Sequence, residues 1–167
     1  MGTAVKFIPV TSDELLELYQ LAETIWFPSY RHSHSEEKLK FLFDKMYNQK
    51  EMLQQLKSNA KQFFFIENDS HLKIGYFALE PANKILKLDK IYVDQSQQKL
   101  GIGGKVIDFL KEHATQNNFK SIVLNVNRKN ESAIGFYKKH HFIITDSIDI
   151  DAGNGFIFDD YVMRYDL

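Results

Sequence analysis

Residues Gln98 to Leu110 read QKLGIGGKVIDFL, in which three glycines within four positions are followed at once by an amphipathic helical pattern. A helix leaves its first backbone N–H groups unpaired and carries about half a positive charge at that end. A loop without side chains lets an anion such as a phosphate approach those N–H groups directly. This stretch therefore predicts an anion-binding helix N-terminus, with an ordinary glycine turn between strand and helix as the alternative.

The composition leaves anion binding to such local groups. The chain has 167 residues, 21 of them basic and 22 acidic, and its net charge of −1 gives no overall field for nucleic acid or an anionic membrane. The absence of cysteine excludes disulfides, a thiol nucleophile and cysteine-bound zinc. No stretch is long and apolar enough to span a bilayer, and the N-terminus lacks the pattern of a signal peptide. We therefore expect a cytoplasmic protein, with neither nucleic acid nor membrane as a partner, whose residues 1–167 form a single domain.

The order of the hydrophobic patterns predicts a mixed α+β fold. Strands are expected at 4–10, 62–67, 72–79, 86–93, 121–126, 142–150 and 156–165, and helical regions from Ser12 to about Trp26-Phe27-Pro28, after Ser35, after the glycines and at 130–139. A crossover from 86–93 through the glycine-fronted helix to 121–126 favours parallel neighbours. We expect a mostly antiparallel mixed sheet of about seven strands that contains a parallel pair and is flanked by about four helices.

Spacing separates the anions that could bind to the glycine loop. A dinucleotide fingerprint G-x-G-x-x-G would need glycine at position 106, which is Val106. A nucleotide P-loop needs glycine five residues before Gly104-Lys105 and a hydroxyl just after it, and these positions hold Lys99 and Val106. Both motifs fail, and the pattern that remains is Q-x-x-G-x-G, from Gln98 to Gly103.

This motif, which follows Ile91-Tyr92-Val93, resembles the acetyl-CoA motif of the GCN5-related N-acetyltransferase (GNAT) superfamily. Asn130-x-x-Ala133-x-x-Phe136-Tyr137-Lys138-Lys139 resembles the later helix of the same family. The stretches KQFFFIEND, KLDKIYVDQSQQKLGIG and NRKNESAIGFYKKHHF are similar to bacterial spermidine/spermine acetyltransferases of the PaiA type. The chain departs from the family at His141, where a glycine usually precedes the last phenylalanine.

The resemblance implies an enzyme that moves the acetyl group of acetyl-CoA to a primary amine by direct attack in a ternary complex, without a metal. It implies that the backbone of Ile91 and Val93 pairs with the pantetheine amides and that Tyr137 gives a proton to the leaving thiolate. Simple packing of the helix on the sheet is the alternative for Tyr137. The implied cofactor-binding residues are Ile91, Tyr92, Val93, Gln98, Lys99, Leu100, Gly101, Ile102, Gly103, Gly104, Asn130, Tyr137 and Lys139.

Two further roles are less closely tied to a motif. Asp89 is the candidate general base because it precedes Val93 by four residues in a strand, which puts both on one face. An ordinary strand carboxylate paired with Lys87 is the alternative. Asn130 is expected to cap the helix that follows it, as well as to contact CoA.

The segment from Trp26 to His34 joins the first two predicted helices, which in the family cover the acceptor pocket. Trp26, Tyr30 and His32 are the candidate substrate residues, since aromatic rings bind ammonium groups through cation–π contacts. A hydrophobic plug under the helices is the alternative. His32 and His34 have no third ligand at a suggestive spacing, so no metal is expected.

The acceptor itself is open at this level. Asp146, Asp149, Asp151, Asp159 and Asp160 suit a polycation, or they are charges that protect a sheet edge from aggregation. We expect a small-molecule amine such as a polyamine, with a protein N-terminus or a lysine as the alternative acceptor. A non-catalytic acyl-CoA sensor or interaction module is the rival class, which Tyr137 argues against and His141 leaves open. The last strand, 156–165, either pairs across a homodimer or is a central strand.

Overall fold

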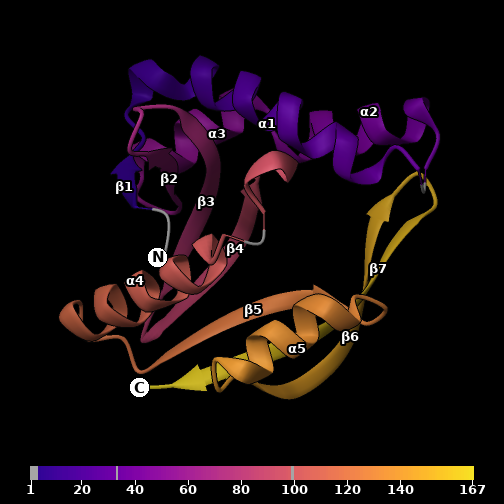
Figure 1. Cartoon of the computed structure of the whole chain (residues 1–167). Helices are drawn as coiled ribbons and strands as arrows, with labels where there is room; N and C mark the ends of the chain where they lie inside the picture. Colours follow the sequence, from indigo (N-terminus) through magenta and orange to yellow (C-terminus); the bar gives the residue numbers. More distant parts are fainter. Residues whose placement is uncertain (1–3, 33, 99) are drawn as a thin grey trace. The chain divides into compact units, whose positions relative to one another are not determined.

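The computed structural model describes residues 4–32, 34–98 and 100–167, and its strands form one mixed sheet in the order β1-β2-β3-β4-β5-β7-β6 (Figure 1). The elements are β1 (Val5–Pro9), η1 (Ser12–Glu14), α1 (Leu15–Tyr30), α2 (Glu36–Met46), α3 (Gln49–Lys57), β2 (Gln62–Asn68), β3 (Lys73–Ala82), β4 (Ile85–Val93), η2 (Gln95–Gln97), α4 (Ile102–Gln116), β5 (Ser121–Asn127), α5 (Glu131–Lys139), β6 (Ile143–Gly153) and β7 (Phe156–Asp166). The parallel pair is β4–β5, as expected from the crossover through α4.

The predicted fold class is confirmed, and one helical region is divided. The region after Ser35 forms two helices, because α2 ends at Met46 with Tyr47 as its C-cap, and Asn48 then starts α3 by accepting a hydrogen bond from the Glu51 N–H. Within the described residues, no helix combines the length and the apolar composition that a membrane span requires. The chain forms two compact units. The first unit contains the residues up to Glu80 together with Lys90–Ile102, and the second unit contains Pro81–Asp89 together with Gly103–Leu167.

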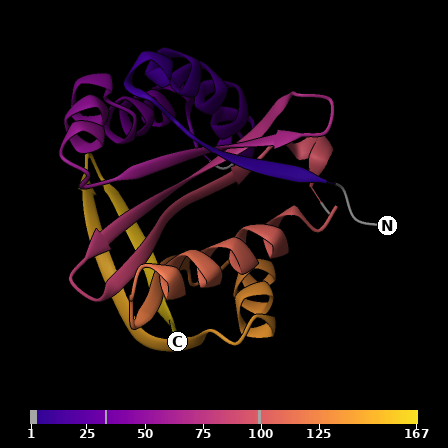
Figure 2. The same cartoon turned by 90° about the vertical axis from the view of Figure 1, so that its left-hand side faces the viewer.

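In the first unit the helices α1–α3 cover one side of the strands β1–β3 (Figure 2). The core between them contains buried aromatic side chains. Strand β2 pairs antiparallel with both β1 and β3. Its run Phe63–Ile66 is buried at every position, which explains why this strand reads as continuously apolar instead of alternating. Phe64 stacks on Phe77 of β3 with ring centroids 5.0 Å apart.

Helix α1 runs further than the sequence indicated. It was expected to end near Trp26-Phe27-Pro28, but it continues through Pro28 to Tyr30. A proline inside a helix removes one hydrogen bond and costs about 3 kcal/mol. Ile25 and Trp26, which are 3% and 1% exposed, anchor this part of the helix in the core, and such burial is worth about 1.5–3 kcal/mol for each large side chain. Tertiary packing therefore overrides the local helix-ending signal.

Four tyrosines of the first unit meet as two hydroxyl pairs. The hydroxyls of Tyr47 and Tyr76 are 2.6 Å apart, and those of Tyr30 and Tyr92 are 2.9 Å apart. The rings of Tyr76 and Tyr92 join the two pairs at a centroid distance of 5.7 Å. Burial raises the pKa of the Tyr47, Tyr76 and Tyr92 hydroxyls, so all three stay protonated at neutral pH.

The second unit places α4 and α5 on one face of its sheet, and α5 lies along β5 in Figure 1. The Lys111 Nζ of α4 sits 4.1 Å from the ring centroid of Tyr165 in β7, and Phe142, just after α5, contacts the same ring at 5.6 Å. Along β5, Ile122, Leu124 and Val126 are buried on this face, whereas Val123 and Asn125 between them are half-buried and Asn127 is exposed. The opposite face of the unit therefore carries partly exposed and polar side chains.

The last strand is an interior strand. Strand β7 pairs antiparallel with β5 on one side and with β6 on the other, so of the two alternatives the central strand is correct, and β6 forms the edge. Strands β6 and β7 are joined at Asn154-Gly155, both with positive φ (52° and 80°), as a type I′ turn requires. This tight turn extends β6 to Gly153, beyond the predicted end at Ile150.

The paired tyrosine hydroxyls allow a test of the core. Tyr76→Phe leaves the buried Tyr47 hydroxyl without its partner, and we expect a loss of about 1–3 kcal/mol in the free energy of unfolding. The double change Tyr47→Phe/Tyr76→Phe removes both polar groups and should restore most of that loss. Urea denaturation of both single variants and the double variant measures the coupling, and additive losses would contradict the pairing.

Candidate active site

The loop that ends β4 is held by its own side chains. The Asp94 carboxylate accepts hydrogen bonds from the Ser96 N–H and hydroxyl at 2.9 and 2.6 Å, and the Asp94 N–H donates to the Ile74 carbonyl of β3 at 2.8 Å. The Gln98 side-chain amide donates to the Val93 carbonyl at 3.1 Å. The glutamine of the predicted motif thus ties the loop back to the end of the strand whose backbone is predicted to meet the pantetheine.

Gly101 adopts a left-handed conformation, with φ of +77°, directly before α4 begins at Ile102. This conformation is strained for residues with a Cβ atom. No atom lies within 4 Å of the position that a Cβ would take, so the backbone here faces open space. The predicted neighbours Leu100 and Ile102 are exposed and buried respectively, and Lys99 lies outside the described residues. An accessible backbone at the start of a 15-residue helix fits the phosphate-binding role predicted for this loop.

Gly103 has a different function from Gly101, because it allows α5 to approach α4. A Cβ at Gly103 would lie 3.1 Å from Phe136 Cζ, a tight contact that would move the ring by a few tenths of an ångström. At Gly104 the nearest atom would be His140 Cε1, at an ordinary 3.6 Å. The glycines of the motif therefore bring the helix that carries Tyr137 close to α4, in addition to any contact with a ligand.

Helix α5 is fixed at both ends. Asn130 Oδ1 accepts a hydrogen bond from the Ala133 N–H at 3.1 Å, which confirms the predicted cap. At the other end, the His141 N–H donates to the Lys138 carbonyl at 2.9 Å and the Phe142 N–H donates to the Tyr137 carbonyl at 3.0 Å. These two bonds form a Schellman motif. The predicted cofactor residue Lys139 is exposed in the last turn.

His141 takes the backbone conformation that the family glycine would take. Its φ is +72°, at the left-handed position of the motif. The departure from the family pattern therefore changes the side chain and leaves the turn intact. Lys111 of α4 adds a hydrogen bond from its Nζ to the His140 carbonyl at 3.0 Å, which offsets the negative end of the α5 dipole.

Tyr137 is the buried residue of α5, with 9% of its surface exposed. Its ring packs between Phe136 and Phe142, at centroid distances of 5.2 and 5.8 Å. Burial raises the pKa of the Tyr137 hydroxyl to about 12, so the hydroxyl carries its proton at neutral pH. In the described part of the chain no hydrogen bond engages that hydroxyl. The Tyr137 side chain is therefore fixed and its hydroxyl is neutral, and its ring packs α5 against its neighbours, as the packing alternative predicts.

The candidate base and acceptor residues have different environments. Asp89 is half-buried on β4. Trp26 is 1% exposed and Tyr30 is bonded to Tyr92, both on α1, whereas His32 is exposed in the turn that follows. Burial raises the pKa of Tyr92, and the nearby Trp26 indole opposes part of that shift. Within the described residues, the Trp26 indole N–H makes no hydrogen bond of normal geometry.

These positions correct one expectation about the acceptor segment. Trp26 to Tyr30 belong to the last turns of α1, so they do not join two helices as a loop. The sequence did not indicate that Tyr47 and Tyr76 pair with each other, because each lies in or beside an apolar run. In the described residues, no group of three or more histidine or acidic side chains is arranged to hold a metal ion.

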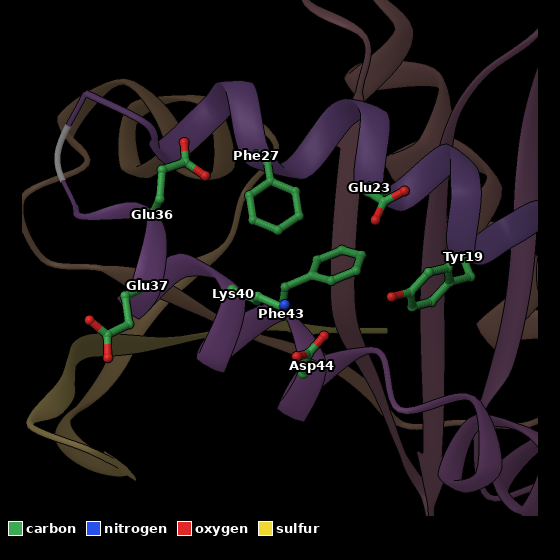
Figure 3. A pocket seen from close by; sticks show the side chains of 8 residues that line it. All are labelled: Tyr19, Glu23, Phe27, Glu36, Glu37, Lys40, Phe43 and Asp44. Atoms are coloured by element: carbon green, nitrogen blue, oxygen red, sulfur yellow. The ribbon is translucent and has the colours of Figure 1, made fainter.

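A hollow between α1 and α2 is lined by residues outside the predicted site (Figure 3), although the Trp26 ring contacts the lining rings of Phe27 and Phe43 at centroid distances of 5.2 and 5.5 Å. The rings of Phe27 and Phe43 line it with centroids 4.9 Å apart, and Phe43 is almost fully buried. Its other lining residues are Tyr19, Glu23, Glu36, Glu37, Lys40 and Asp44. Arg31 already pairs with Glu36 at 3.3 Å and lies over the Phe27 ring at 5.9 Å. We assign no chemistry to this hollow.

Comparison with known proteins identifies the class. The sequence profile of the acetyltransferase (GNAT) family matches residues 15–142, so the chain belongs to this family and is an N-acetyltransferase, an acyltransferase that uses acetyl-CoA. A curated relative, described as an uncharacterized N-acetyltransferase in the pepI 3′ region of Lactobacillus delbrueckii subsp. lactis, is 22% identical over 165 residues, which cover 89% of this chain and 95% of the relative.

Solved structures share the fold. The PaiA N-acetyltransferase from Thermoplasma acidophilum, in complex with coenzyme A, matches with a TM-score of 0.80 and 19% identity, over 98% of this chain and 99% of that chain. A chimera of the spermidine N-acetyltransferase SpeG from Vibrio cholerae and hSSAT matches with a TM-score of 0.74 and 17% identity, over 97% and 95%. At this identity the likeness establishes the fold, and the acceptor has to be argued from the residues.

Changing His141 to glycine tests the end of α5. A left-handed conformation costs a residue with a Cβ about 1–2 kcal/mol in the folded state. Glycine avoids this strain, but its greater conformational entropy in the unfolded state cancels part of the gain in stability. We expect His141→Gly to raise the free energy of unfolding by about 0.5–1 kcal/mol in urea denaturation. His140→Gly is the matched control, because His140 has a φ of −91° and gains nothing. Equal effects of the two changes would contradict this explanation.

Proposed function

We propose that the enzyme acetylates a primary amine, with a polyamine as the favoured acceptor, and that residues 1–167 act as a single N-acetyltransferase domain. The observation that carries the proposal is the buried, protonated hydroxyl of Tyr137 on a helix fixed at both ends. Acetyl transfer from a thioester needs such a proton at the leaving thiolate. A non-catalytic acyl-CoA sensor would not need this arrangement.

The remaining roles follow from the chemistry of the transfer. Acetyl-CoA supplies the activated acyl group, and the N–H groups around Gly101 and the start of α4 are proposed to hold its diphosphate. The Val93 N–H is the proposed donor to the thioester oxygen, which stabilises the charge that develops during attack. The full set proposed to bind CoA is Ile91, Tyr92, Val93, Gln98, Lys99, Leu100, Gly101, Ile102, Gly103, Gly104, Asn130, Tyr137 and Lys139.

For the acceptor we propose an aromatic contact from α1. Tyr30 is half-buried, and an ammonium group is attracted to the face of such a ring. Trp26 is 1% exposed, so its proposed part is to support the Tyr30 ring, whose centroid lies 4.9 Å from its own. Lys90 gives an internal example, because its Nζ lies 5.2 Å from the ring centroid of Tyr47. His32 is proposed to contribute from the exposed turn after α1.

Asp89 is the proposed general base, since an amine must lose a proton to become a nucleophile. It is half-buried on β4 and shares a strand face with Val93. We expect Asp89→Asn to remove the acidic limb of the pH profile of kcat/KM for the amine. An unchanged acidic limb would exclude Asp89 from this role and leave it as a structural carboxylate.

Binding and turnover together test the function. Acetyl-CoA should raise the melting temperature by mass action, whereas NAD and ATP should not. Release of free thiol from acetyl-CoA, measured with a panel of monoamines, diamines, spermidine, and peptides with a free N-terminus or lysine, then identifies the acceptor class. Binding of acetyl-CoA without thiol release in the presence of any of these acceptors would favour the sensor.

Tyr137→Phe separates proton donation from packing, because it removes only the hydroxyl. We expect kcat to fall by about 10- to 1000-fold, as for loss of a general acid, while calorimetry shows nearly unchanged acetyl-CoA binding. Phe136→Leu is the control, since it changes packing at the neighbouring position and keeps the proton donor. Wild-type kcat in Tyr137→Phe would remove Tyr137 from the mechanism.

A further inference from the structure

The carboxylates near the C-terminus, which the sequence presents as one group, have distinct environments in the second unit. Asp149 and Asp159 lie directly opposite each other on β6 and β7, and Arg128 neutralises both, with its Nη2 at 2.5 and 3.6 Å. Asp146 and Asp151 are exposed and accept hydrogen bonds at 2.8 Å from the backbone N–H groups of Ser147 and Gly153. These four carboxylates serve the β6–β7 hairpin itself.

Asp160 differs from them in its surroundings. It is half-buried on the interior strand β7, opposite Asn127 of β5 and Ile148 of β6. Burial raises the pKa of its carboxyl, and the neighbouring Asn125 side-chain amide opposes that shift. The charged groups that act on it are Arg128 and Lys87, which favour the anion, and Asp159, which disfavours it. Because Arg128 is already bound to Asp149 and Asp159, Asp160 is an anion that a further cation would stabilise.

The position of Asp160 on the sheet links it to the reaction. The parallel register of β4 and β5 pairs Ile85–Leu88 with Ser121–Leu124, and Asn125 is the next residue of β5. Asn125 and Asp160 share the face opposite α4 and α5, since Asn125 alternates with the buried Leu124 and Val126. Tyr137 belongs to the side of α4 and α5.

Direct attack requires the amine to approach the thioester from the side that the donor does not occupy. If α4 and Tyr137 serve the acetyl donor, as proposed above, the acceptor meets the face that carries Asn125 and Asp160. We propose that Asp160 binds a second ammonium group of the acceptor, and that Asn125 is the positioning residue that orients its carboxylate. The enzyme then prefers diamines and polyamines to monoamines of the same length. This inference rests on the proposed function.

The energetics favour Asp160 over its exposed neighbours. An ion pair in water contributes little, because both partners lose strong hydration and salt screens the charge. A half-buried carboxylate has already lost part of its hydration, so an ammonium group at the same distance interacts more strongly. One oriented anion beside a second ammonium is sufficient to select for a diamine, since the uncharged end of a monoamine gains nothing there.

The test compares spermidine and 1,4-diaminobutane with butylamine as acceptors of wild-type enzyme, Asp160→Asn and Asp151→Asn. Asp160→Asn keeps the shape and removes the charge. We expect it to raise the KM of the two polycations about 10- to 100-fold, with the KM of butylamine and of acetyl-CoA changed less than about 3-fold. Asp151→Asn is the matched control, because an asparagine oxygen still accepts from the Gly153 N–H, and it should match the wild type.

Two readouts separate a direct contact from a structural effect. Calorimetry of 1,4-diaminobutane with the enzyme saturated with CoA should show weaker binding for Asp160→Asn without any turnover. In the wild type, the KM of the diamine should rise as the pH falls through the Asp160 pKa, because protonation removes the anion, and Asp160→Asn should lack this rise. Asn125→Leu should raise the KM of the diamine and spare kcat for butylamine.

The outcomes distinguish this inference from the function on which it rests. If the wild type acetylates all three amines and Asp160→Asn shifts their KM values equally, or shifts none, the subsite is wrong and the acetyltransferase assignment to a primary amine stands. If the wild type binds acetyl-CoA but acetylates none of the amines, the proposed acceptor class falls, and the subsite falls with it.

Discussion

The close approach of α4 and α5 is the constraint on which the second unit of this protein depends. It is tightest at Gly103, where the ring of Phe136 lies 3.1 Å from the place that a Cβ would occupy, so any side chain there would push the ring away by a few tenths of an ångström. It also requires α5 to end in a left-handed turn that brings Phe142 back against Tyr137. Given both conditions, the Tyr137 hydroxyl is buried, fixed and protonated. A looser packing would let water reach the hydroxyl and would lose its orientation.

Burial has opposite consequences for the two kinds of acid in this fold. For tyrosine, burial favours the neutral form, so the Tyr47 hydroxyl of the first unit and the Tyr137 hydroxyl of the second keep their protons at neutral pH. For a carboxylate it makes the anion more responsive to a nearby cation. Asp160 is in this position, whereas Asp149 and Asp159 already share Arg128. The chemistry of each group follows from its partners more than from its residue type.

Membership of the GNAT family establishes the activity, whereas the likeness to polyamine acetyltransferases does not establish the acceptor. The family profile covers most of the chain and carries the activity and the use of acetyl-CoA. The solved structures are below 20% identical to this chain, so their acceptors do not transfer with the fold. The acceptor has to be inferred from local features, namely the aromatic cluster around Tyr30 and the single carboxylate Asp160. His141, where the family usually has glycine, keeps the left-handed backbone conformation of the turn after α5.

The sequence by itself determined the element order, the parallel β4–β5 pair and the glycine loop before α4, because hydrophobic period, helix caps and glycine spacing are local properties of the chain. It also indicated Tyr137 and Asn130 through their motif. It could not show that α1 continues through Pro28, since only the burial of Ile25 and Trp26 outweighs the missing hydrogen bond.

Only the tertiary structure decided which chemically similar residues differ in function. Gly101 faces open space and Gly103 faces Phe136, although both belong to one motif. Five aspartates near the C-terminus look alike in sequence, but strand register places two of them on Arg128 and one beside Asn125. The physical reason is that desolvation, hydrogen bonds and ion pairs depend on neighbours that are distant in the chain, and no local pattern specifies them.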